Sequence, residues 1–192
     1  MKKDEKLAMT KEKLINAAAE LMQSCTDGSE VTSRAVADKA GVRLSMINYC
    51  FGSKEALLFE AFSRNEKAYR ENPQIQSIIS SEESPKEKLK KLHLAAADFL
   101  INGYKFTRAI TGYVLLHRDL SKEQASLPFV MAHFGGNKTE QECKLIAYEL
   151  SSMMQLAIYR LDDIKEYTGL DLRDREQLKD FIDMRINMLL GE

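Results

Sequence analysis

Hydrophobic and polar residues follow a helical period along almost the whole chain. Apolar side chains recur every three or four positions, the spacing that places them on one face of a helix. No alternating pattern of the kind that predicts a strand persists anywhere, so we expect an all-α protein. The pattern predicts helices over approximately residues 11–25, 53–72, 84–103, 104–118, 139–165 and 174–190.

Start and stop signals sharpen these boundaries. A capping residue followed three positions later by Glu or Gln is typical of a helix start. The chain shows this pattern at Ser84-Pro85-x-Glu87, Thr139-x-x-Glu142 and Asp174-x-x-Gln177. Pro128 falls within an apolar segment that ends at Gly135, and it should break or kink a helix there. The serine-rich segment 74–84 has poor periodicity, so we expect a loop at a domain boundary.

Residues 32–54 are the most informative stretch, because two short helical segments flank a tight turn there. Thr32 is a good N-cap for the first segment, and Gly41 can supply the positive φ angle that ends it. In the second segment the apolar side chains of Ile47, Cys50 and Phe51 share one face. Its outer face carries Arg43, Leu44, Ser45, Asn48 and Tyr49. This is the pattern of a helix-turn-helix motif, whose second helix fits a DNA major groove.

The same stretch resembles the DNA-binding domain of TetR-family transcriptional regulators. The matching positions are Val31, Thr32, Val36, Ala37, Ala40, Gly41 and Val42, then Ile47, Asn48, Tyr49, Phe51, Lys54, Glu55, Leu57 and Leu58. They fall at the family's spacing without gaps, and the match covers about the first third of the chain. Arg43 and Ser45 stand where the family more often has a small hydroxyl residue and a glycine. The operator sequence therefore does not carry over.

The resemblance implies a homodimeric DNA-binding regulator, a repressor that reads a palindromic operator in double-stranded DNA. It implies a helix-turn-helix domain over residues 1–52 and a helical regulatory and dimerisation domain over 53–192, with the helix 53–72 connecting the two. Thr32, Tyr49 and Lys54 match positions that hold phosphates, whereas the other DNA-facing residues lie on or near the groove side. The whole expected DNA-binding set is Thr32, Ser33, Arg34, Arg43, Leu44, Ser45, Asn48, Tyr49 and Lys54.

The helices that follow residue 84 are rich in methionine and aromatic residues. These side chains are either flexible core filler or the lining of an adaptable apolar cavity with a few polar groups. The family resemblance favours the cavity, because the C-terminal domain of these regulators usually binds a small inducer. The expected effector is a hydrophobic or aromatic molecule, since this stretch has little Arg or Lys on its helical stripes. The expected lining is Phe99, Tyr104, Phe106, Tyr113, His117, Met131, Phe134 and Met153.

The last two predicted helices have apolar stripes that look too broad to be covered inside one small domain. Two such helices repeated by a twofold axis make a four-helix interface, and the family resemblance points the same way. The residues expected at the dimer seam are Leu150, Met154, Ile158, Phe181 and Met188.

The amino-acid composition narrows the class of protein but does not indicate a function. The chain of 192 residues is 44% hydrophobic and 30% charged, with a formal net charge of −1, so the DNA prediction depends on the motif and not on charge. No apolar run approaches a membrane span, and the first ten residues have no apolar signal region. Three widely spaced cysteines suit a reducing compartment, so we expect a cytoplasmic protein.

No sequence motif for catalysis or for a cofactor is present. GxSxG, P-loop and GxGxxG patterns are absent, and the three histidines lack the short spacing of a helical metal pair. We therefore expect no enzyme activity, no metal and no cofactor. Two alternatives remain: a helix-turn-helix regulator that is controlled by a protein partner, and a helical metal-binding protein or enzyme.

Overall fold

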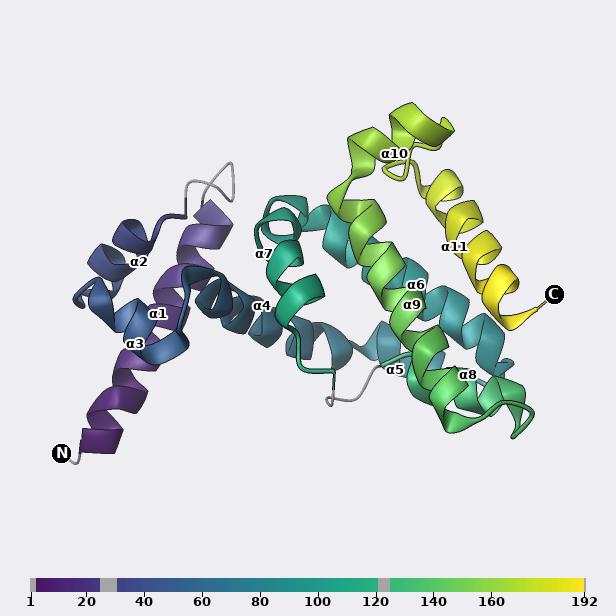
Figure 1. Cartoon of the computed structure of the whole chain (residues 1–192), viewed down its shortest axis with the longest axis horizontal. Helices are drawn as coiled ribbons and strands as arrows, with labels where there is room; N and C mark the ends of the chain where they lie inside the picture. The colour runs from purple at the N-terminus through teal and green to yellow at the C-terminus, as the bar shows by residue number, and fades with distance from the viewer. Residues whose placement is uncertain (1–2, 25–30, 121–124, 192) are drawn as a thin grey trace. The chain divides into compact units, whose positions relative to one another are not determined.

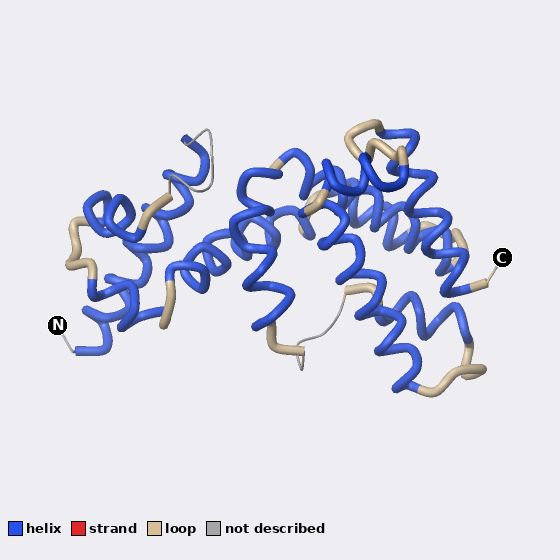
Figure 2. Tube along the Cα trace, turned by 45° about the horizontal axis from the view of Figure 1, so that its top comes forward, coloured by secondary structure: helices blue, strands red, loops and turns tan. Residues whose placement is uncertain are grey.

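The computed structural model describes residues 3–24, 31–120 and 125–191. Over these ranges the chain forms eleven helices and no strand, which confirms the all-α prediction (Figures 1 and 2). Their bounds are α1 Lys3–Ser24, α2 Ser33–Ala40, α3 Ser45–Phe51, α4 Lys54–Arg70, α5 Pro73–Ser80, α6 Pro85–Asn102, α7 Tyr104–His117, α8 Leu127–Phe134, α9 Glu140–Tyr159, α10 Leu161–Thr168 and α11 Arg175–Leu190. No helix within these ranges is both long enough and apolar enough to cross a membrane.

The helices divide into two compact units. Unit 1 comprises residues 1–70 and 105–117, and unit 2 comprises residues 71–104 and 118–192. Unit 1 therefore holds α1 to α4 and nearly all of α7, although α7 lies in the middle of the sequence (Figure 1). Apolar residues from α4 and α7, among them Leu57, Leu58 and Ile110, are buried in the same core as those of α1 to α3. The compact unit thus extends well beyond residue 52, and a functional boundary at that position stays a prediction.

The core of unit 1 follows the apolar stripes of its helices. Leu14 and Ala18 of α1, Val36 of α2, Ile47 of α3 and Leu57 of α4 are each no more than 1% exposed. Burying a leucine or isoleucine side chain stabilises a fold by roughly 1.5–3 kcal/mol, so these few contacts fix the helix-turn-helix against its supporting helices. Helix α1 begins eight residues earlier than predicted, at Lys3, and Cys25 at its predicted end lies outside the described residues.

Unit 2 is built around α6, which packs against α5, α8, α9 and α11. The predicted capping box at the start of α9 is present: Glu142 N–H donates to Thr139 Oγ1 at 3.3 Å, and Thr139 N–H donates to Glu142 Oε2 at 2.8 Å. The predicted helix 139–165 is interrupted at Arg160, where φ and ψ of −110° and 35° leave the helical region. Two helices, α9 and α10, therefore replace one.

Two predictions about helix boundaries are wrong. The segment expected to be a loop contains α5, because Asn72 Oδ1 accepts the N–H of Gln74 at 2.8 Å and Pro73 occupies the first turn. An Asn-Pro pair that ends one helix can also start the next, since the first turn needs no N–H donor. For the same reason Pro128 does not break a helix, and it lies in the first turn of α8.

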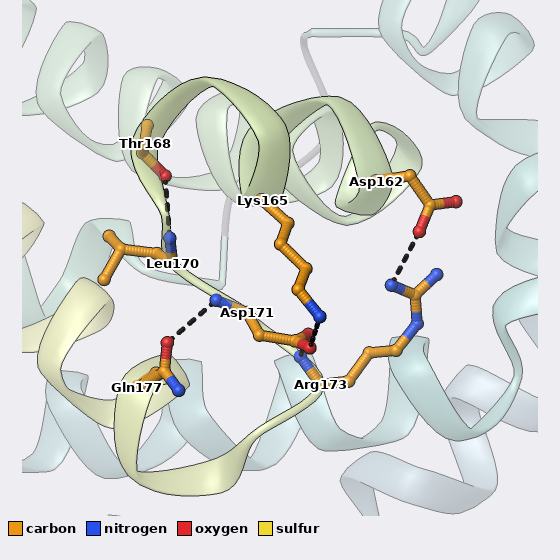
Figure 3. Close-up of polar contacts among 7 residues, drawn as sticks. All are labelled: Asp162, Lys165, Thr168, Leu170, Asp171, Arg173 and Gln177. Atoms are coloured by element: carbon orange, nitrogen blue, oxygen red, sulfur yellow. Dashed lines mark hydrogen bonds and ion pairs between the residues drawn. The ribbon is translucent and has the colours of Figure 1, made fainter.

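The connection between α10 and α11 is held by polar contacts, which Figure 3 shows. The Asp171 carboxylate accepts from Lys165 Nζ at 2.7 Å and from the Arg173 N–H at 3.1 Å, and these contacts lower the pKa of Asp171. Asp174 caps α11 alone, and no box forms with Gln177. The Gln177 side chain accepts instead from the Asp171 N–H at 2.8 Å.

One buried histidine makes the stability of unit 2 depend on pH. His93 on α6 is 7% exposed, its Nε2 lies 2.9 Å from Ser126 Oγ, and burial lowers its pKa to about 4. Since an unfolded histidine titrates near 6.5, protons bind the unfolded chain preferentially between these values. The stability is complete above pH 6.5 and is lost as the pH falls toward 4. We expect the free energy of unfolding to drop by about 2 kcal/mol from about pH 7 to about pH 5.

Urea denaturation of the wild type and of His93→Gln at the two pH values tests this expectation. Glutamine keeps a hydrogen-bonding group beside Ser126 but does not titrate, so the pH dependence should largely disappear in that variant. His117→Gln is the matched control, because His117 is exposed. An equal pH dependence in wild type and His93→Gln would contradict the assignment.

Candidate functional site

The helix-turn-helix has the geometry that its sequence predicts. The Ala35 N–H donates to Thr32 Oγ1 at 3.1 Å, which caps α2. Gly41 adopts φ +64° and ends α2, while the Val42 N–H returns to the Ala37 carbonyl at 3.0 Å. The turn is therefore closed by backbone hydrogen bonds, and glycine is required where a side chain would be strained.

Helix α3 buries one side and exposes the other. Ile47 is 1% exposed, and Cys50 and Phe51 are half-buried against the core of unit 1. On the opposite side Leu44 is 47% and Tyr49 is 65% exposed. Arg43, Ser45 and Asn48 are exposed as well. A cationic, hydroxyl and amide-bearing helix face open to solvent is what base-edge recognition requires.

Two of the three expected phosphate-binding residues, Thr32 and Lys54, lie at helix starts, whereas Tyr49 lies within α3. Thr32 is exposed, and its hydroxyl accepts the capping bond while keeping its own proton to donate to a phosphate. Ser53 Oγ accepts the Ala56 N–H at 3.0 Å and so caps α4 directly before Lys54. The N-terminus of a helix favours anions, so Lys54 adds a charge to a site already suited to phosphate.

Not every predicted DNA-facing residue is equally open. Arg34 is exposed, whereas Ser33 and Lys54 are half-buried. Lys54 Nζ lies 3.7 Å from Glu55 Oε1, a pair too long and too exposed to hold the lysine firmly. Assignment of these residues to DNA stays a prediction.

Helix α1 supports the motif from behind. Lys39 on α2 forms an ion pair with Glu20 at 2.9 Å, and Arg64 on α4 forms one with Glu12 at 2.6 Å. The Arg64 contact lowers the pKa of Glu12. Exposed pairs of this kind are worth about 0–1 kcal/mol each, so they orient α1 more than they stabilise it.

The residues predicted to line one effector cavity are divided between the two units. Phe106, Tyr113 and His117 belong to unit 1, and Tyr113 and His117 line an open groove of about 490 Å³ there. The other members belong to unit 2, where they are Phe99, Tyr104, Met131, Phe134 and Met153. Met153 borders a cavity of about 10 Å³ beside His93, which is room for no more than a water molecule.

The remaining unit 2 members have other surroundings. The Phe134 ring packs against the core and lies beneath Lys138 Nζ at 5.1 Å, and the Tyr104 ring lies beneath the Arg173 guanidinium at 5.7 Å. Met131 is 44% exposed. The contacts given for Tyr104, Met131, Phe134 and Met153 thus do not gather these four residues around one cavity of ligand size.

Most of the predicted dimer-seam residues are buried within unit 2. Leu150, Met154, Ile158 and Phe181 are 4%, 9%, 1% and 7% exposed, because they form the core of unit 2 itself. Only Met188 of the predicted set is exposed, at 68%. Side chains this buried offer little surface to a second copy, so a larger apolar surface is sought elsewhere on the same helices.

A different face of α9 and α11 carries exposed apolar side chains. The members of this α9–α11 face are Leu145, Tyr148, Leu156, Met184 and Met188, between 40% and 68% exposed. Arg185 Nη2 lies 2.9 Å from Glu149 Oε1 and joins the two helices beside this face. Periodicity identified both helices as amphipathic, but Met188 is the one member of this exposed face that the sequence analysis had selected.

The chain has the all-α fold of TetR transcriptional regulators. A TetR transcriptional regulator from Rhodococcus sp. RHA1 superposes with a TM-score of 0.58 at 17% identity, over 97% of each chain. A TetR-like transcriptional regulator from the same organism gives a TM-score of 0.52 at 18% identity, over 95% of this chain and 97% of the other. No family model and no curated protein matches the sequence. The resemblance seen in residues 31–58 is confirmed as a likeness of the whole fold.

No three His, Cys, Asp or Glu side chains among the described residues group closely enough to hold a metal ion.

Proposed function

We propose that the protein is a ligand-responsive transcriptional repressor that binds a palindromic operator as a homodimer. The observation that carries this proposal is the exposed outer face of α3, where Asn48 and Tyr49 are open to solvent on a helix whose other side is buried, with Arg43 exposed directly before it. The fold shared with TetR transcriptional regulators supports it.

Binding would separate into two kinds of contact. Thr32, Tyr49 and Lys54 would hold phosphates and set the position of α3, while Arg43 and Asn48 would read base edges in the major groove. Leu44 is exposed and could contact a thymine methyl group. Phosphate contacts give affinity for any sequence, and the base contacts give preference for one.

Dimerisation would place two copies of α3 one helical turn of DNA apart, as a palindrome requires. The α9–α11 face is the surface of unit 2 that we assign to the interface, because its apolar side chains are otherwise left in water. A twofold axis would bring this face against itself in an isologous contact.

Release would follow from a ligand that binds one conformation of the dimer more tightly than the other. A ligand with equal affinity for both would change nothing. A protein partner could control DNA release in the same way, by binding one conformation of the dimer more tightly than the other.

Sequencing the genomic DNA fragments that the purified protein captures tests the proposal directly. We expect enrichment of one palindromic sequence, and we expect that fragment to bind at least about a thousandfold more tightly than random DNA. Fragments without a shared sequence, or binding that does not distinguish them from random DNA, would contradict a sequence-specific regulator.

A further inference from the structure

An open groove of about 490 Å³ lies within unit 1, and its volume is typical of a small-molecule site. One wall is the end of α3, the turn after it and the first turn of α4, represented by Phe51, Gly52, Ser53, Glu55 and Ala56. The other wall is the last two turns of α7, represented by Gly112, Tyr113, Leu116 and His117. The groove therefore joins the candidate recognition helix to a helix from the middle of the chain.

The α7 wall presents apolar and aromatic surface to the groove. The Tyr113 ring lies 5.7 Å from Phe59 and 5.3 Å from His117, measured between ring centroids, so it is supported on both sides. Leu116 on the same wall is 77% exposed. A planar apolar ligand would shield Leu116 from water and could stack on the Tyr113 ring.

Gly112 opens this wall, and neither the backbone nor the packing requires a glycine there. It lies inside α7 and does not have a positive φ angle. A Cβ built on it would meet nothing within 4 Å. Glycine inside a helix is destabilising relative to alanine. Gly112 therefore lowers the stability of α7, and its evident effect is to leave room for a ligand in the groove.

Charge indicates which planar molecule fits. Among the described residues that line the groove, Glu55 carries a carboxylate, and its contact with Lys54 Nζ is long at 3.7 Å. The aromatic rings of Phe51 and Tyr113 line the same groove, and aromatic rings attract cations through their faces. We propose that the groove binds a small aromatic cation, and that its occupation controls the helix-turn-helix directly.

The coupling would act through the turn between α3 and α4. The Gly52 N–H donates to the Asn48 carbonyl at 2.9 Å, and Ser53 Oγ caps α4. A ligand held between this turn and α7 favours one angle of the recognition helix over others. Release of DNA then follows if that angle differs from the one that DNA selects. This part of the inference rests on the proposed function, whereas binding of the ligand does not.

Tryptamine is a suitable probe, because it combines an indole ring with a protonated amine and the chain contains no tryptophan. Its indole fluorescence can therefore be followed without a tryptophan background. Tryptophol and indole-3-acetate carry the same ring with a neutral and an anionic substituent. We expect tryptamine to bind most tightly and indole-3-acetate most weakly. No binding of any of the three, or the reverse order, would overturn the proposal.

Two substitutions locate the site. Gly112→Leu fills the groove and should raise the melting temperature of the free protein while weakening tryptamine binding at least about tenfold. Glu55→Gln removes the charge and should bring the affinity for tryptamine down to that for tryptophol. Glu60→Gln, an exposed change elsewhere on α4, and Ala132→Leu, an exposed change on α8, are the matched controls. Tryptamine binding that survives both groove substitutions would overturn the assignment.

The effect on DNA is measured separately with the captured operator fragment. We expect saturating tryptamine to weaken operator binding by about 5- to 150-fold, and the operator to weaken tryptamine binding by the same factor. If the protein captures no specific DNA, the proposed function fails while the groove result stands. If the operator binds and tryptamine does not, the groove inference alone fails.

Discussion

Alanine at Asn48 or Arg43 should relax the base preference of the protein, whereas alanine at Lys54 should weaken its binding to every DNA sequence by a similar factor. A bidentate base contact is worth about 1–3 kcal/mol. A symmetric dimer uses each residue twice, so either base-reading variant should lose about 2–6 kcal/mol on the operator. Loss of Lys54 should lower the salt dependence of binding by about one unit for each protomer.

Titrations of operator and random DNA at several salt concentrations separate these effects. Glu60→Ala on the exposed side of α4 is a control that changes charge without changing a predicted contact. If Lys54→Ala lost affinity on the operator only, the phosphate assignment would be wrong. If Asn48→Ala weakened operator and random DNA equally, Asn48 would not read a base.

If the protein dimerises through the α9–α11 face as proposed, glutamate at Leu145 and Met188 together should leave it monomeric at micromolar concentration. These side chains are 67% and 68% exposed, so charges at these positions should leave the fold of unit 2 intact. In a twofold interface the double variant buries four unpaired carboxylates, and desolvation of each costs several kcal/mol. Operator affinity should fall with dimerisation, because one α3 alone reads half a palindrome.

Light scattering and sedimentation measure the assembly, and circular dichroism reports the fold. Met131→Glu is the matched control, since Met131 is 44% exposed on α8 outside the α9–α11 face. A wild type that is already monomeric, or a double variant that stays dimeric, would contradict the placement of the interface.

Local sequence signals determined the helices and their caps. Thr32, Ser53, Thr139 and Asp174 each accept a backbone N–H at a helix start. Capping depends on atoms within three or four residues, so it can be predicted without knowing the fold. The helix-turn-helix was predictable for the same reason, because Gly41 and the buried Ile47 define it over a short stretch.

Pairings between distant segments were decided by the tertiary structure alone. Leu150 and Met154 looked suitable for a dimer seam, but they are buried by α6 and α11 within one protomer. Periodicity shows that a helix has an apolar face, but it does not show what covers that face. Pro73 and Pro128 were ambiguous as well, because proline can end one helix or begin another, and only the neighbouring packing selects between them.

The groove in unit 1 was also predicted only in part from the sequence. Tyr113 and His117 were recognisable from the sequence as an aromatic and an imidazole group on one helix. Ser53 and Glu55, on the other wall of the groove, lie more than fifty residues earlier in the chain. From the sequence, both were placed with the DNA-binding stretch. The sequence by itself determined that this protein is helical and carries a helix-turn-helix. The tertiary structure decided that α7 packs in the unit of that motif, because burial of Ile110 in its core outweighs the distance along the chain.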